Sequence, residues 1–154
     1  MKRFMLSAVL LLVFATTVFA TSAEVVTKYR YDTFVEIKIA WTAHTDGVWT
    51  SHAFTTEEMN FVKGKWLCQI VTDPGTPAPD ANYDVYIYNS GSADLLGGAG
   101  VNRHTTTTEI AYPIVDSSSG QRACVPVTDT MTVTLAEIGA DAAGHQGVLR
   151  MIFR

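Results

Sequence analysis

Four histidines are the side chains of this sequence best suited to metal binding or to acid–base catalysis: His44, His52, His104 and His145. None of them lies in HExxH or in another zinc-binding spacing. His44 and His52 flank a turn that contains Asp46, so a metal site built from these three residues is conceivable. Solvent-exposed histidines at a turn are the simpler interpretation. The sequence therefore predicts no metal site and no bound cofactor.

Serine and carboxylate chemistry is no better supported. A serine nucleophile needs GxSxG, or a base and an orienting acid, and neither Ser90 nor Ser119 has this setting. Asp84 and Asp94 could be nominated as a pair for glycoside hydrolysis, but any protein of this size offers such pairs. The glycine-rich residues 97–100 lack the GK[ST] of a P-loop, and no helical pattern follows them. We therefore predict a non-enzymatic protein.

Aromatic side chains are the remaining candidates for a binding surface, and we single out Trp49, Tyr86 and Tyr88. Tyrosine and tryptophan stack on sugars and anchor partner proteins. A period of two places Tyr86 and Tyr88 on one face of a strand, opposite Val85 and Ile87. If Val85 faces the core, the two tyrosines are exposed or lie in an interface. Packing of the tyrosines against another sheet is the competing interpretation, and the one that we favour.

The elements that position these side chains are two apolar runs near the middle of the chain, residues 65–72 and 83–89. We predict a pair of strands at the centre of the fold. The connector DPGTPAPDA joins them, and its Asp-Pro-Gly begins with residues typical of turns. Its later prolines favour an extended path.

Alternation predicts further strands elsewhere, at residues 33–41, 48–54, 105–113, 122–127, 131–135 and 148–153. A short helical turn with a threonine cap is expected near residues 55–59. About seven or eight strands without a long helix predict an all-β protein. We expect an antiparallel β-sandwich, jelly-roll-like or immunoglobulin-like.

The first 23 residues have the layout of an export signal. Lys2 and Arg3 precede an apolar run, and small residues suited to cleavage end at Ala20 or Ala23. An uncleaved membrane anchor is the alternative, although the run is short of the roughly 20 residues that span a bilayer. The prediction is a signal peptide or apolar segment at residues 1–23 and one domain at residues 24–154.

Charge argues against nucleic acid as a partner. Losing Lys2 and Arg3 leaves nine of the 11 basic residues against 15 acidic ones, a net charge near −6. The remaining basic residues are scattered, whereas phosphate binding requires clustered lysine and arginine. Membrane contact is expected only through the N-terminal segment, if that segment is uncleaved.

Cys68 and Cys124 are the two cysteines of the chain. A disulfide between them is plausible in an exported protein. Two buried, unpaired thiols are the alternative, because free cysteine behaves as a small apolar residue.

The segment from Lys63 to Pro113 resembles a family of small, β-rich phage virion proteins of poorly defined role. The resemblance is carried by VTDPGTPAPDANYDVYIYN, by ADLLGGAGVNRHTTTTEIAYP and by the closing GVLRMIFR, about half of the mature sequence. It implies a capsid-decorating or tail-associated structural subunit that binds its own copies or neighbouring virion proteins. The family contributes no catalytic residue.

The export-like segment departs from that family, because virion subunits normally assemble in the cytoplasm. The expected location is therefore the virion, or the periplasm or cell exterior if the signal works. In the second case, an exported module that binds carbohydrate or another surface through Trp49, Tyr86 or Tyr88 is the alternative function.

Overall fold

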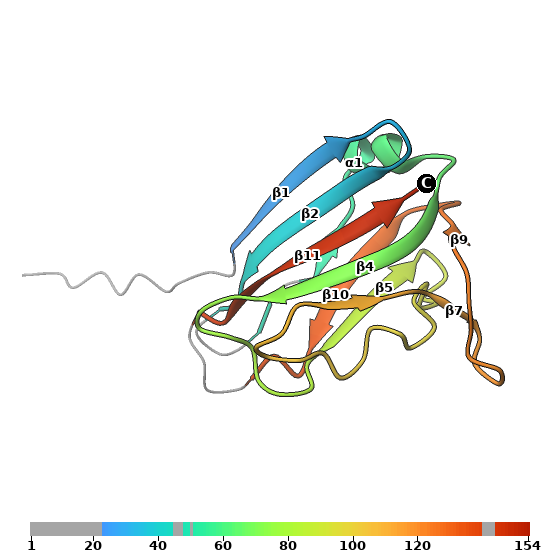
Figure 1. Ribbon diagram of the computed structural model, residues 1–154. Coiled ribbons are helices and arrows are strands. Elements are labelled where there is room, and N and C mark those ends of the chain that lie inside the picture. Colours follow the sequence, from blue (N-terminus) through green and yellow to red (C-terminus); the bar gives the residue numbers. More distant parts are fainter. Residues whose placement is uncertain (1–22, 45–47, 50, 140–143) are drawn as a thin grey trace, which may run out of the picture.

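Two antiparallel sheets pack face to face in the computed structural model, which describes residues 23–44, 48–49, 51–139 and 144–154 (Figure 1). The strands in chain order are β1 (Ala23–Arg30), β2 (Val35–Thr42), β3 (His52–Ala53), β4 (Trp66–Pro74), β5 (Asp84–Asn89), β6 (Glu109–Ala111), β7 (Ile114–Asp116), β8 (Gln121–Arg122), β9 (Val125–Pro126), β10 (Met131–Ala136) and β11 (Gln146–Phe153). One helix, α1 (Thr56–Val62), accompanies them. The predicted all-β sandwich is confirmed.

The larger sheet has the order β1-β2-β11-β4-β6, with β9 also paired to β4. The smaller sheet has the order β3-β10-β5, and β7 and β8 form a separate hairpin. In Figure 1 the larger sheet lies in front of β10 and β5. Every strand pairing is antiparallel.

The core lies between the two sheets, because each long strand alternates buried and partly exposed residues. Ile37 and Ile39 of β2 are fully buried, as are Met151 of β11 and Ile87 of β5. These side chains belong to one continuous apolar cluster. Period-two patterning therefore predicts the inward faces of β2, β10 and β11 correctly.

The two central strands, β4 and β5, do not pair with each other, since they lie in different sheets. The proline-containing connector between them carries the chain across the sandwich. Gly75 lies where it contacts β11: its amide donates to the Gln146 carbonyl at 2.8 Å, and a Cβ there would come within 2.7 Å of the Gln146 side chain. Only glycine allows this close approach.

Helix α1 begins at the predicted threonine cap. Thr55 Oγ1 accepts from the Glu58 amide at 3.2 Å, and Glu58 Oε2 accepts from the Thr55 amide at 2.7 Å. This reciprocal pair is a capping box, which satisfies two amides left without helical partners. The helix extends to Val62, a turn beyond the predicted segment.

Several strands differ from the prediction. The structure has eleven strands in its described residues, and β1 was not predicted at all. Its residues do not alternate between buried and exposed, and Val26 is the one that packs against the main apolar cluster. β3 and β6 are shorter than predicted, and β8 and β9 replace one predicted strand. Residues 1–22 lie outside the described residues, so the signal peptide stays a prediction.

Candidate interaction surface

Trp49 is a core residue, so its predicted place on a binding surface is wrong. Only 4% of the residue is exposed, and its ring centroid lies 6.5 Å from that of Trp41. The Trp41 ring lies 6.4 Å from Tyr83. The three rings close one end of the space between the sheets, and burial of such large apolar surfaces outweighs any tendency of this loop residue to face water.

Tyr86 and Tyr88 lie on the outer face of the smaller sheet, partly exposed and stacked with centroids 5.6 Å apart at 13°. The favoured prediction that they pack in the core is wrong, because Val85 and Ile87 occupy the inner face of β5. Tyr86 Oη donates to Asp84 Oδ2 at 2.9 Å. That hydrogen bond to a carboxylate raises the pKa of Tyr86 to about 12.

Asp84 and Asp94 bind backbone amides. Asp84 Oδ1 accepts from the Asn102 amide at 2.8 Å, and Asp94 accepts from the amides of Leu96 and Gly98 at 3.0 and 2.9 Å. Both carboxylates therefore hold the loop after β5 in place.

His52 is buried, although the sequence suggested a histidine exposed at a turn. Only 6% of it is exposed, and its ring lies between two carboxylates. Nδ1 is 2.8 Å from Glu24 Oε1, and Nε2 is 3.1 Å from Glu58 Oε2. This Glu–His–Glu bridge joins β1, β3 and α1, so the two glutamates orient the imidazole and hold β1 against the helix.

The structure places His145 and His104 in separate settings. His145 is buried, and its Nδ1 donates to the Ile138 carbonyl at 2.5 Å. His104 is exposed and accepts from the Thr106 amide. Asp46 lies outside the described residues. Within the described ranges, no cluster of three or more His, Cys, Asp or Glu side chains could hold a metal ion.

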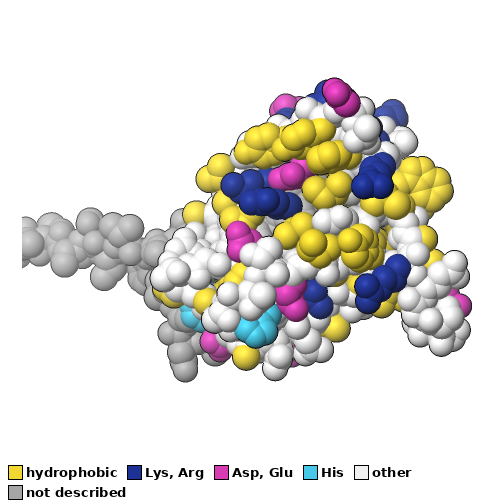
Figure 2. All heavy atoms as spheres, in the orientation of Figure 1, with side chains coloured by type: hydrophobic (Ala, Val, Ile, Leu, Met, Phe, Trp, Pro, Cys, Tyr) yellow, Lys and Arg dark blue, Asp and Glu magenta, His cyan; other side chains and the backbone are white. Residues whose placement is uncertain are grey.

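The outer face of the larger sheet is a broad surface that carries many apolar side chains. Paired residues of antiparallel strands point to the same side, so the strand registers give three rows across this face. The rows are Val25–Ala40–Val148–Asp73, Thr27–Lys38–Arg150–Val71–Ile110 and Tyr29–Glu36–Ile152–Gln69. Figure 2 shows hydrophobic side chains spread over this face, with lysine and arginine between them. We call these residues the outer face.

Basic residues occupy the middle of the outer face. Lys38 and Arg150 are direct cross-strand neighbours. Arg150 Nε lies 4.0 Å from Glu36 Oε1, whereas Lys38 has no ion-pair partner among the described residues. Glu36 and Asp73 lie on the same face, so Lys38 is the cation at its centre that is available to a partner.

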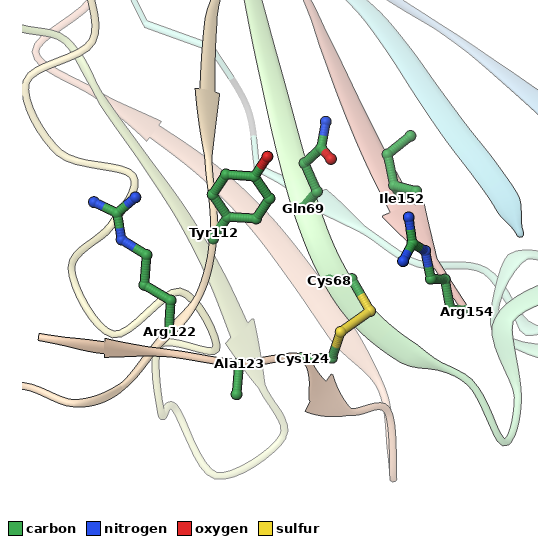
Figure 3. Close-up of a pocket in the computed structure, with 8 residues that line it drawn as sticks. All are labelled: Cys68, Gln69, Tyr112, Arg122, Ala123, Cys124, Ile152 and Arg154. Atoms are coloured by element: carbon green, nitrogen blue, oxygen red, sulfur yellow. A yellow bond between two sulfur atoms is a disulfide. The ribbon is translucent and has the colours of Figure 1, made fainter.

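A disulfide borders the outer face at one end. Cys68 and Cys124 are bonded, which joins β4 to the segment just before β9. Next to the disulfide is an open pocket of about 230 Å³ (Figure 3). Its lining includes Tyr112, Arg122 and Arg154, and neither guanidinium has an ion-pair partner in the described part of the chain. The pocket also includes Gln69 and Ile152, so it is continuous with the outer face.

Comparison with protein-family models, with curated proteins and with solved structures finds no match for this chain.

The described residues also contain no helix long and apolar enough to cross a membrane. The features on which a function can be argued are therefore the outer face, its arginine-lined end and the tyrosine pair. Sequence reasoning found the tyrosines but missed the outer face. Its apolar members are scattered over five strands, and only the sheet order places them side by side.

Proposed function

We propose that this chain is a non-enzymatic structural protein that acts through protein–protein contacts made by the outer face. The virion subunit implied by the sequence resemblance, decorating a capsid or associated with a tail, is the specific form of this proposal. Its partners are then other copies of the chain or neighbouring virion proteins. The observation that carries the proposal is the apolar character of a sheet face that no other part of the described chain covers.

Exposure of individual side chains supports an interface. A sheet that packs one face on a core usually has polar residues on the face toward water. Here Val25 is 65% exposed, Ile110 54% and Tyr112 41%. Val25 lies at the β1 edge and Ile110 at the β6 edge, so apolar exposure extends across the width of the sheet. Exposed apolar patches are typical of contact surfaces, and tyrosine and arginine are enriched in such surfaces.

The charges on the outer face indicate the chemistry of the partner. Lys38 and Arg150 lie at its centre, and Arg122 and Arg154 at its disulfide end. Guanidinium groups bind carboxylates with two parallel hydrogen bonds. The fitting partner surface is therefore apolar, with Asp or Glu side chains placed to reach Lys38, Arg122 and Arg154, which have no ion-pair partner among the described residues.

The test uses Ile110→Asp and Val148→Asp on the outer face, with Thr107→Asp in an exposed loop as the matched control. The chain is produced together with the products of its neighbouring genes, and particles are isolated by sedimentation. We expect the parent chain and Thr107→Asp to sediment with particles, and both outer-face variants to be lost from them at least about tenfold. A parent chain that joins no particle and binds no co-expressed protein contradicts the proposal.

The tyrosine pair favours a second candidate, an exported module that binds carbohydrate. Tyr86 and Tyr88 are stacked on the solvent side of the smaller sheet, where a flat aromatic surface can contact a sugar ring. Glycan-array binding that is lost in Tyr86→Ala and Tyr88→Ala, but kept in Tyr31→Ala, would support this candidate over the first. An array without any signal would remove it.

A further inference from the structure

β1 is the one long strand edge left open in the part of the chain that the structure describes. The opposite edge of the larger sheet is formed by β6, only three residues long, and Pro113 follows it. Along β5, the loop 93–103 covers the edge, because Val85 donates to the Gly100 carbonyl and Leu95 to the Ile87 carbonyl. β3, at the remaining edge, has two residues.

β1 is a long and regular edge strand. Its charged residues Glu24, Lys28 and Arg30 are on the inward side, where they contact His52, Glu57 and Phe61. Its eight residues pair with β2 without a bulge and contain no proline or glycine. Its backbone makes no hydrogen bond to any described element other than β2. Lys28 forms an ion pair with Glu57 of α1. Monomeric proteins usually block so long an edge with charges, prolines or bulges.

We propose that β1 pairs antiparallel with β1 of a second copy, about a two-fold axis that passes beside Thr27 perpendicular to the sheet. The two larger sheets would then form one continuous sheet. A two-fold interface uses the same residues from both copies, so the pairing must be self-complementary. β1 meets this condition.

The side chains of β1 select the register. Centring on Thr27 places Val26 opposite Lys28 beside the axis and, further out, Glu24 opposite Arg30 and Val25 opposite Tyr29, twice each. The last two kinds of pair favour this register. Glu24 with Arg30 joins opposite charges. Val25 with Tyr29 joins two exposed apolar side chains, at 65% and 40%, on the outer face. Both of these kinds of cross-strand pair stabilise an antiparallel ladder.

The neighbouring registers fit less well. An axis perpendicular to the sheet keeps inward residues opposite inward residues, so the register can shift only by whole two-residue steps. Centring on Lys28 places two ammonium groups directly opposite each other. Centring on Val26 leaves Arg30 without a partner in β1 and places Val25 opposite Thr27 instead of Tyr29.

The inference concerns the edge of the sheet, where Val25, Thr27 and Tyr29 of β1 also belong to the outer face. A dimer through β1 would set two outer faces side by side. Ile110 and Val148 belong to the outer face but lie away from β1, so Ile110→Asp and Val148→Asp should leave an edge dimer intact. Loss of the dimer in those variants would assign it to the outer face and overturn the edge pairing.

The experiment places like charges on the proposed axis. In a homodimer of Thr27→Lys or of Thr27→Glu, two equal charges face each other at residue 27. In an equimolar mixture of the two variants, a lysine of one copy can face a glutamate of the other. Thr107→Lys and Thr107→Glu, in an exposed loop, are the matched controls. Light scattering with size-exclusion chromatography over a range of concentrations measures the dimer, and thermal melting checks that each variant is folded.

We expect the parent chain to dimerise, each Thr27 variant to weaken dimerisation about fivefold or more, and the mixture to restore it. Thr27→Cys should form an intermolecular disulfide under mild oxidation, while Val25→Cys should do so only when mixed with Tyr29→Cys. A parent chain that is monomeric at high concentration overturns the inference. Thr27 variants that dimerise as the parent does would also overturn it.

Discussion

At the scale of single residues, polar side chains that could have been catalytic are used to hold the backbone. Asp94 accepts from three amides, those of Ile87, Leu96 and Gly98, and thereby shapes the glycine-rich loop. Asp84 binds one amide and the hydroxyl of Tyr86. These contacts give both carboxylates a structural role in the loop that follows β5.

Tyr86 provides a pH-dependent measurement of this arrangement. Its pKa is raised to about 12 chiefly by the hydrogen bond to Asp84, so Asp84→Ala should return it toward 10. Phenolate absorbance, taken as the difference from Tyr86→Phe, measures the change. Asp129→Ala, which removes a carboxylate bonded to Ser90 instead, should leave the titration unaltered.

The same shift predicts a sign for stability. A raised pKa means that the folded state favours the neutral phenol, so this contribution is complete below pH 10 and is lost as the pH rises toward 12. Between these values the parent chain should therefore lose stability more steeply than Tyr86→Phe. The free energy of unfolding of both proteins is measured by urea titration at several pH values. An equal loss of stability with pH in the parent chain and in Tyr86→Phe would contradict the assignment.

At the scale of elements, α1 holds β1 onto the rest of the sandwich. The helix supplies Glu57 to Lys28 and Glu58 to His52, and the Phe61 ring lies 4.9 Å from the Arg30 guanidinium. β1 has few core residues of its own, and Val26 is the one that packs against the main apolar cluster. The position of this edge strand therefore depends on the helix as well as on its pairing with β2.

The cap of α1 makes this dependence measurable. Thr55→Ala removes the acceptor of the Glu58 amide and should lower the free energy of unfolding by about 1 kcal/mol. Thr56→Ala, at the first helical position, is the matched control and should have a much smaller effect. Hydrogen exchange should show faster exchange in β1 of the Thr55 variant. Unchanged exchange there would mean that β2 alone holds the strand.

At the scale of the whole molecule, the disulfide ties together parts of the chain that are distant in sequence. Cys68 and Cys124 are 56 residues apart, and the enclosed segment contains β5, β6 and the loops that cover the β5 edge. The bond also fixes the arginine-lined end of the outer face, because both cysteines line that pocket. The same disulfide therefore contributes to the stability of the fold and to the shape of the pocket at this end of the outer face.

Removing the cross-link should be costly. Cys68→Ala with Cys124→Ala should lower the free energy of unfolding by about 4 kcal/mol, as expected for releasing a loop of this length in the unfolded chain. Denaturant titration measures the loss, and the reduced parent chain should match the double variant. A decrease in the free energy of unfolding well under 1 kcal/mol would contradict this estimate of the contribution of the disulfide.

Local patterns in the sequence determined the strands β2, β10 and β11, the start of α1 at Thr55 and the crossing near Gly75. These features depend on residues only a few positions apart, and side-chain alternation or a capping pair is visible at that range. Tertiary structure decided which faces are covered. It buried Trp49 and His52, turned Tyr86 and Tyr88 outward and left β1 as an open edge. Coverage depends on partners from distant strands and from α1, and no local pattern specifies the order in which those elements assemble.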